Sequence, residues 1–115
     1  MTKLFIDYVE LAVGDLPAAR AFYESAFGWT FNDYGGVYAC FVGPDGTDEA
    51  GGMYASEAPV APLPLLRTSD LDAAVTAVEA AGGTVVEPPY EYPGGRRFLF
   101  TDPGGNRLGV YEPAH

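Results

Sequence analysis

Two residues near the start of the chain, Tyr8 and Glu10, have side chains that can bind a polar ligand or exchange a proton. They lie two positions apart in a segment of alternating apolar residues, so in a β-strand they share one face. A carboxylate on a mostly apolar surface must be paired, solvated or neutral. Glu10 is therefore the candidate proton-transfer group, and Tyr8 is a candidate ligand contact. Alternatively, Arg67 or Arg107 pairs with Glu10, which would make the carboxylate structural.

The elements that must position these side chains occur twice in the chain. Residues 15–31 resemble residues 70–86, so that Asp15-Leu16 corresponds to Asp70-Leu71 and Gly28 to Gly83. A repeat of this length indicates one supersecondary unit packed against its copy. Each candidate position in one copy therefore has a counterpart in the other.

Each copy has the residue pattern of a strand, a helix and three further strands. Period-two alternation predicts strands, Asp15 and either Ser69 or Asp70 cap the helices, and Gly28 and Gly82-Gly83 end them. The expected strands are 4–13, 29–34, 37–42, 50–55, 63–68, 84–87, 96–101 and 107–112. The proline-rich residues 88–95 are expected to form a long loop. We predict one domain over 1–115, with modules at about 1–56 and 63–115 joined by a linker at 57–62 that contains Pro59 and Pro62.

These residues resemble the vicinal oxygen chelate superfamily of glyoxalases, bleomycin-resistance proteins and extradiol dioxygenases. The resemblance rests on Asp15-Leu16, Phe22-Tyr23, Phe27-Gly28-Trp29, Asp102-Pro103-Gly104-Gly105-Asn106 and Gly109-Val110-Tyr111-Glu112-Pro113, in that order. It implies an α+β fold of two tandem β-α-β-β-β modules that form a half-open barrel around a cavity, with helices outside. It also implies a homodimer.

Metal-using members of this superfamily place a His, Glu or Gln ligand on the first and last strand of each module. The resemblance puts these positions at Tyr8, Gly52 (or Met53, if the register slips), Leu63 and Gly109. Glycine and leucine offer no donor atom, and a neutral phenol is a poor ligand for such a metal. We therefore expect no metal and no cofactor, which disfavours a metal-dependent glyoxalase or dioxygenase.

Strand alternation also predicts which side chains line the cavity. Besides Glu10, the expected ligand-binding residues are Tyr8, Tyr54, Leu63, Leu65, Arg67, Arg107 and Tyr111. This apolar and aromatic lining with a few polar groups is typical of small-molecule sites, and Gly52 and Gly109 are expected to leave room for the ligand. Two functions remain open. The chain binds a small organic molecule as a sequestering or accessory protein, or it is a lyase or isomerase that uses Glu10 or a cavity tyrosine for acid–base chemistry.

Composition limits the partners. The net charge of −10 argues against nucleic acid or an anionic membrane, because both carry phosphate charge, and is compatible with a cationic ligand. No apolar run has the length of a membrane helix, and no signal peptide is expected. The single cysteine, Cys40, cannot form an internal disulfide, so we expect a cytoplasmic protein. His115, at the end of the chain, is not expected to be catalytic.

Overall fold

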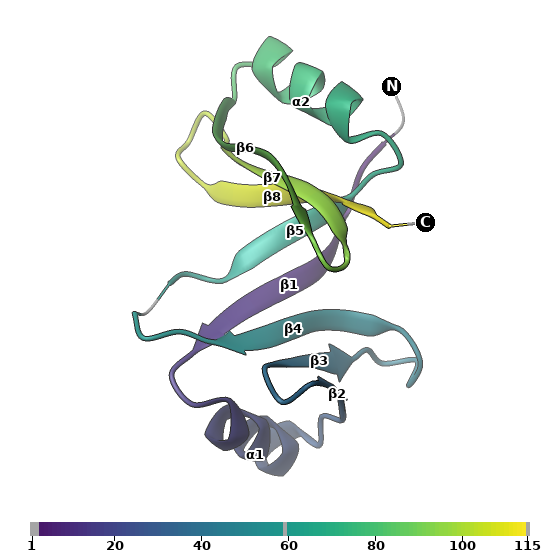
Figure 1. The fold of residues 1–115 in the computed structure, drawn as a ribbon, viewed down its shortest axis with the longest axis vertical. Coiled ribbons are helices and arrows are strands. Elements are labelled where there is room, and N and C mark those ends of the chain that lie inside the picture. Colours follow the sequence, from purple (N-terminus) through teal and green to yellow (C-terminus); the bar gives the residue numbers. More distant parts are fainter. Residues whose placement is uncertain (1–2, 59, 115) are drawn as a thin grey trace. The chain divides into compact units, whose positions relative to one another are not determined.

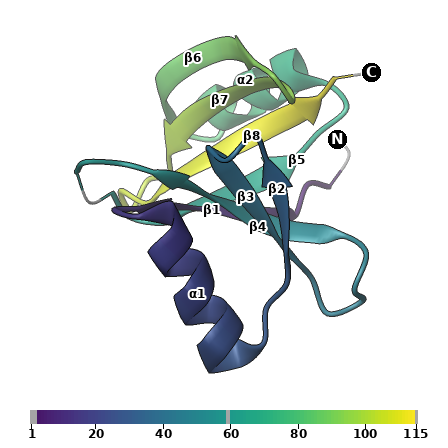
Figure 2. The same cartoon turned by 60° about the horizontal axis from the view of Figure 1, so that its bottom comes forward.

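The computed structural model describes residues 3–58 and 60–114, so Pro59 and His115 lie outside the described residues. The chain divides into two compact units. We call Tyr8–Pro62 the N-terminal unit, and we call Leu63 onward, together with the residues up to Asp7, the C-terminal unit. Each unit contains one helix and a four-stranded sheet among the described residues (Figures 1 and 2). The α+β class and the duplicated β-α-β-β-β order are confirmed.

The N-terminal unit contains α1 (Leu16–Phe27), β2 (Phe31–Tyr34), β3 (Tyr38–Val42) and β4 (Glu49–Ala55). It also contains β1 (Ile6–Val13) except for its first two residues, which belong to the C-terminal unit. The sheet order is β2-β3-β4-β1, with antiparallel pairs except for the parallel pair of β1 and β4. Helix α1 packs on β3 and β4. Its core joins Leu16 from the helix to Ala39 and Met53 from the sheet. Leu11 and Val13 of β1 pack against this core, so the opposite face of β1 carries Tyr8 and Glu10.

The C-terminal unit repeats the order with β5 (Leu63–Arg67), α2 (Leu71–Ala80), β6 (Thr84–Tyr92), β7 (Gly95–Thr101) and β8 (Arg107–Pro113). Its sheet order is β5-β8-β7-β6, with β5 and β8 parallel. Helix α2 packs on β6, β7 and β8. Leu71, Ala74, Phe98 and Val110 form the buried core.

Asp15 caps α1 as expected, and of the two candidates Ser69 and Asp70 it is Asp70 that caps α2. Asp15 accepts a hydrogen bond from the Ala18 N–H at 3.0 Å, and Asp70 accepts one from the Ala73 N–H at 3.1 Å. These bonds satisfy backbone donors that the first helical turn leaves without partners. Helix α1 ends at Gly28, whose φ of 73° lies in the left-handed region that glycine adopts without strain.

The expected loop at residues 88–95 is wrong, because β6 continues to Tyr92. Tyr92 pairs with Gly95, so β6 and β7 form a tight hairpin. Two register irregularities interrupt β6, one between Val85 and Glu87 and one between Glu87 and Tyr90. Pro88 and Pro89 fall in the second, where the missing proline N–H groups break no regular ladder. Within its unit β6 is also the outer strand, the position at which a sheet tolerates proline.

The aromatic residues around α1 differ in how far they are covered. Trp29 precedes β2 and stacks on Tyr23 with ring centroids 4.5 Å apart, which anchors the end of the helix. Phe22 and Phe27, by contrast, remain more than half exposed. Neither α1 nor α2, the helices of the described residues, is long and apolar enough to cross a membrane.

Candidate functional site

The face of the N-terminal sheet opposite α1 brings Glu10 next to two residues of β3. Register places Glu10 beside Gly52 on β4, and Gly52 beside Cys40 on β3. Tyr38 lies two residues before Cys40, so its side chain points to the same face. Four polar side chains from two strands thus meet on one surface: Tyr8, Glu10, Tyr38 and Cys40. We call them the Glu10 cluster.

A chain of hydrogen bonds joins the Glu10 cluster. The Tyr38 hydroxyl donates to Oε2 of Glu10 at 3.0 Å, and its oxygen lies 2.8 Å from the Tyr8 hydroxyl oxygen. The Tyr8 hydroxyl oxygen lies 3.3 Å from Sγ of Cys40. A phenol has one proton to donate. Because Tyr38 gives its proton to Glu10, Tyr8 donates to Tyr38. The Cys40 thiol donates to Glu49. The two phenols are therefore polarised toward the Glu10 carboxylate.

Burial keeps the phenols and the thiol of this cluster protonated. It raises the pKa of Tyr8 and of Tyr38 well above that of a free phenol. Burial also raises the pKa of Cys40 to about 11, against a lowering effect of the Tyr8 hydrogen bond. The nearby Glu49 and Glu10 carboxylates add to this rise because they disfavour a thiolate. Near neutral pH the Cys40 thiol therefore keeps its proton and is not a nucleophile.

We expect Cys40 to react slowly with iodoacetamide at pH 8, because the thiolate is the nucleophile. The alkylation rate of the folded protein should keep rising toward pH 11, whereas a free cysteine levels off near its usual pKa of 9.0. Mass spectrometry of the native protein across this pH range provides the measurement, with urea-unfolded protein as the control. Equal rates for the folded and unfolded chains at pH 8 would contradict this assignment.

A second carboxylate, Glu49 at the start of β4, lies beside this cluster. It accepts hydrogen bonds from Tyr34 Oη at 2.6 Å and from Asn32 Nδ2 at 3.0 Å. Partial burial opposes ionisation of Glu49, but these two bonds and a third from the Cys40 thiol outweigh it and hold the pKa of Glu49 below its usual value. The Tyr34 pKa rises to about 12, chiefly because Tyr34 donates to Glu49. Glu49 is therefore a fixed negative charge.

Gly52 does not leave room for a ligand, contrary to the sequence-based expectation. A Cβ at this position would lie 2.1 Å from the Tyr38 hydroxyl oxygen and 2.3 Å from its ring. The phenol of Tyr38 thus fills the space above Gly52. Glycine is required here because it lets Tyr38 cross β4 and reach Glu10 on β1.

Gly109 in the C-terminal unit is covered in the same way. Register aligns Leu65 with Gly109 and Arg67 with Tyr111. A Cβ on Gly109 would lie 2.5 Å from Leu65 and 2.9 Å from Leu99, so these two leucines fill the space above the glycine. Tyr111 donates to both carboxylate oxygens of Asp7, at 2.9 and 3.1 Å. Burial and Asp7 raise the pKa of Tyr111, and the positive charge of Arg67 opposes the rise.

The four positions that correspond to metal ligands do not fit a divalent cation. Gly52 and Gly109 supply no side-chain donor, Leu63 is a buried alkyl group, and the Tyr8 phenol stays protonated. Within residues 3–58 and 60–114, no three His, Cys, Asp or Glu side chains gather closely enough to hold a metal ion. We therefore derive no chemical step through a metal.

The predicted site residues fall into two groups, one in each unit. Tyr8 and Glu10 meet in the Glu10 cluster, and Tyr54 lies on the same strand as Gly52, paired with Tyr38. Leu65, Arg67 and Tyr111 lie on neighbouring strands of the C-terminal unit, with Leu63 buried on β5 and Arg107 exposed at the start of β8. A common cavity for the two groups and an arginine partner for Glu10 stay predictions.

Sequence reasoning missed Tyr38, which holds Glu10 in place. Strand parity contained the signal, because Tyr38 and Cys40 alternate with the buried Ala39 on β3. The alternation of side chains along a strand does not reveal that β4 separates β3 from β1. It also does not reveal that Gly52 of β4 lies between Cys40 and Glu10.

Comparisons with known proteins agree with this fold. A sequence model described as Glyoxalase/Bleomycin resistance protein/Dioxygenase superfamily matches residues 5–110. The curated "Putative glyoxylase CFP32" of Mycobacterium bovis is 34% identical over 92% of this chain but only 44% of its own length. The chain therefore spans less than half of that relative.

Among solved structures, an Mn(II)-bound glyoxalase from Novosphingobium aromaticivorans is 27% identical with a TM-score of 0.65, covering 93% of this chain and 38% of the other. Methylmalonyl-CoA epimerase from Mycobacterium tuberculosis has a TM-score of 0.71 at 22% identity, over 96% and 88% of the two chains. At that identity the likeness establishes the fold alone.

Proposed function

The chain belongs to the Glyoxalase/Bleomycin resistance protein/Dioxygenase superfamily, and from this premise we propose that its N-terminal unit binds a small organic cation without a metal ion. The observation that carries the proposal is the hydrogen bond from Tyr38 to Glu10, because it fixes a carboxylate among aromatic side chains. The role would be sequestration of the ligand or its delivery to another protein. The metal-free part of the proposal is supported by the four positions that correspond to metal ligands, because two glycines, a leucine and a protonated phenol offer no good donor atom.

Charge supports a cationic ligand more strongly in this unit than in the whole chain. Residues 8–62 contain a single basic side chain, Arg20, which lies 3.9 Å from Asp33 and over the Phe31 ring. The same residues contain eight carboxylates, which are Glu10, Asp15, Glu24, Asp33, Asp45, Asp48, Glu49 and Glu57. Such an excess raises the local concentration of cations.

Chemistry at the Glu10 cluster supports the same ligand class. Carboxylates bind ammonium groups through charge-assisted hydrogen bonds, and aromatic faces attract cations, worth about 0.5–2 kcal/mol each. Tyr8 and Tyr38 provide aromatic rings beside Glu10, and Glu49 adds a second negative charge. An anionic ligand would meet two carboxylates here.

A second function, acid–base catalysis by Glu10, has one observation in its favour. The Tyr38 hydroxyl donates to Glu10 and Tyr8 donates to Tyr38, so the two phenols orient the Glu10 carboxylate as a proton acceptor. Lyases and isomerases that move a proton next to a carbonyl need such a group. Binding and catalysis predict different results for the same substitution.

Glu10→Gln is expected to weaken binding of a cation such as benzyltrimethylammonium at least tenfold, about 1.4 kcal/mol, because it removes the charge and keeps the shape. Isothermal titration calorimetry measures the change, with benzyl alcohol as the neutral probe. Glu24→Gln is the matched control, because it removes one exposed carboxylate from α1. Tyr38→Phe should weaken binding less, because the carboxylate is kept but loses its fixed orientation.

Equal affinity of wild type and Glu10→Gln would overturn the binding proposal. A variant that still binds its ligand but no longer exchanges the ligand's α-proton for deuterium would favour the catalytic alternative. Elemental analysis of the purified protein tests the metal-free part, which a stoichiometric divalent ion would refute.

A further inference from the structure

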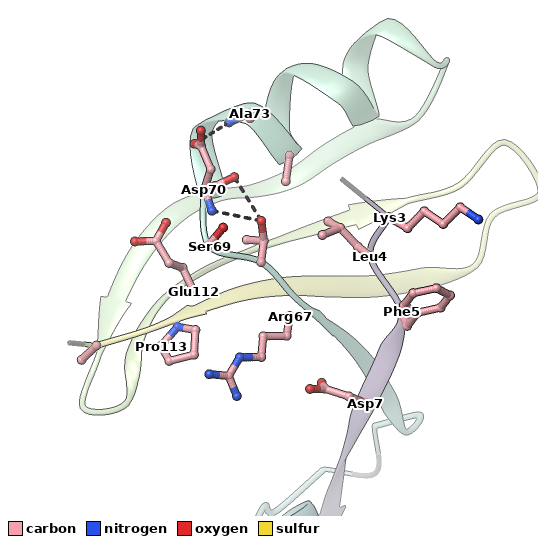
Figure 3. A pocket seen from close by; sticks show the side chains of 13 residues that line it. Lys3, Leu4, Phe5, Asp7, Arg67, Ser69, Asp70, Ala73, Glu112 and Pro113 are labelled. Atoms are coloured by element: carbon pink, nitrogen blue, oxygen red, sulfur yellow. Dashed lines mark hydrogen bonds between the residues drawn. The ribbon is translucent and has the colours of Figure 1, made fainter. Parts of the chain in front are cut away.

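The C-terminal unit contains a pocket of about 700 Å³ whose lining comes entirely from that unit (Figure 3). It lies between the segment Lys3–Phe5, the start of α2 and the end of β8. Leu4, Phe5, Ala73 and Pro113 provide an apolar lining, and Phe5 is 69% exposed, so a bound molecule can cover it. This volume is in the range of sites that hold small organic molecules.

The three carboxylates of the pocket already have partners within the chain. Glu112 accepts a hydrogen bond from the Leu71 N–H at 2.8 Å and lies 3.5 Å from Arg96. Asp70 caps α2 through the Ala73 N–H. Asp7 accepts the Tyr111 hydroxyl with both oxygens. Glu112 also occupies the N-terminal end of α2, where a bound anion would otherwise be favoured.

The two cations of the pocket, Lys3 and Arg67, differ from the carboxylates. Neither has a hydrogen bond or salt bridge to another described residue, although the charge of Arg67 does act on the Tyr111 phenol. Arg67 is exposed at the end of β5 and lines the pocket together with Pro113, and in the view of Figure 3 its guanidinium points to the side of Pro113. The exposed Ser69 adds a hydroxyl group to the same lining.

We infer that this pocket binds a small organic monocarboxylate, with the carboxylate on Arg67 and the apolar body against Phe5 and Pro113. The guanidinium fork matches a carboxylate in two parallel hydrogen bonds. A single negative charge is favoured over a phosphate dianion because Asp7, Asp70 and Glu112 line the same pocket. This site differs from the Glu10 cluster in its unit and in the charge of its ligand.

The test is an NMR titration of the ¹⁵N-labelled whole chain with 3-phenylpropionate, its neutral amide and phenyl phosphate. We expect 3-phenylpropionate to shift the amide signals of Phe5, Ser69 and Ala73, with the amide and the phosphate binding at least fivefold more weakly. Arg67→Gln should raise the dissociation constant for 3-phenylpropionate at least tenfold. Arg20→Gln, the same charge change in the N-terminal unit, should leave it unchanged.

Three results would overturn the inference: no shifts at 10 mM 3-phenylpropionate, equal binding by the amide, or equal affinity in Arg67→Gln. Tighter binding of phenyl phosphate than of 3-phenylpropionate would also contradict the inference, because the preferred ligand of the pocket would then be a phosphate ester. Arg67 is exposed, so its substitution is expected to leave the fold intact, which circular dichroism checks. Glu10→Gln should retain full binding of 3-phenylpropionate, which separates this result from the proposed cation site.

Discussion

Replacing Gly51 by alanine is expected to lower the free energy of unfolding of the N-terminal unit by about 3 kcal/mol, because the added methyl group has no space. A Cβ there would lie 2.2 Å from the Val9 carbonyl oxygen and 2.2 Å from the Phe41 ring. The ring can rotate, but the carbonyl is fixed because Val9 and Gly51 are register partners in β1 and β4. Relief of the clash therefore requires the two strands to separate.

Urea unfolding followed by tyrosine and tryptophan fluorescence measures this loss. Gly14→Ala is the matched control: it has the same change in side chain, and nothing lies within 4 Å of the new methyl group. The control is expected to stay within about 0.5 kcal/mol of wild type. Similar stabilities of the two variants would mean that β1 and β4 are not packed as described.

The difference between Gly51 and Gly52 shows what the sequence could not predict. Both are glycines on one strand, but Gly51 faces Phe41 and Gly52 faces Tyr38. From the sequence, Gly52 was expected to leave room for a ligand. The sequence could not show that the vacant space belongs to Tyr38, because that contact depends on the pairing of β3 with β4.

Local signals, in contrast, predicted most of the elements. The caps Asp15 and Asp70 and the stop at Gly28 act within a few residues, so their effects are visible in the sequence. The second part of strand β6, residues 88–92, was missed because two prolines outweighed the alternation, and only the outer position of the strand and its register irregularities make those prolines tolerable. Likewise, Phe27 is a large apolar residue at the end of α1, but its side chain stays 66% exposed.

The sequence predicted those features of the candidate site that depend on which side chains share one face of a strand. Tyr8 and Glu10 lie on one face of β1, as alternation requires, and Arg67 and Tyr111 lie side by side on β5 and β8. Hydrogen-bond partners join residues 28 to 104 positions apart, such as Glu10 with Tyr38 and Asp7 with Tyr111. No local pattern specifies such partners.

Truncating Phe98 to alanine is expected to lower the free energy of unfolding of the C-terminal unit by about 4 kcal/mol. Phe98 is fully buried on β7 and packs with Leu71, Ala74 and Val110, so its removal leaves a cavity under α2. The helix can move only slightly to fill it, because Asp70 and Glu112 hold its first turn. Urea unfolding monitored by circular dichroism gives the loss.

Phe22→Ala is the control for this prediction, because Phe22 is 57% exposed on α1, where its ring meets the Tyr23 and Phe27 rings edge to face. It should lose less than about 1 kcal/mol. If Phe98→Ala and Phe22→Ala lower the free energy of unfolding equally, the burial of Phe98 does not stabilise the packing of α2 on the C-terminal sheet. That sheet carries Arg67 at the end of β5 and Glu112 on β8, so a loosened core should also weaken 3-phenylpropionate binding in Phe98→Ala and leave it unchanged in Phe22→Ala.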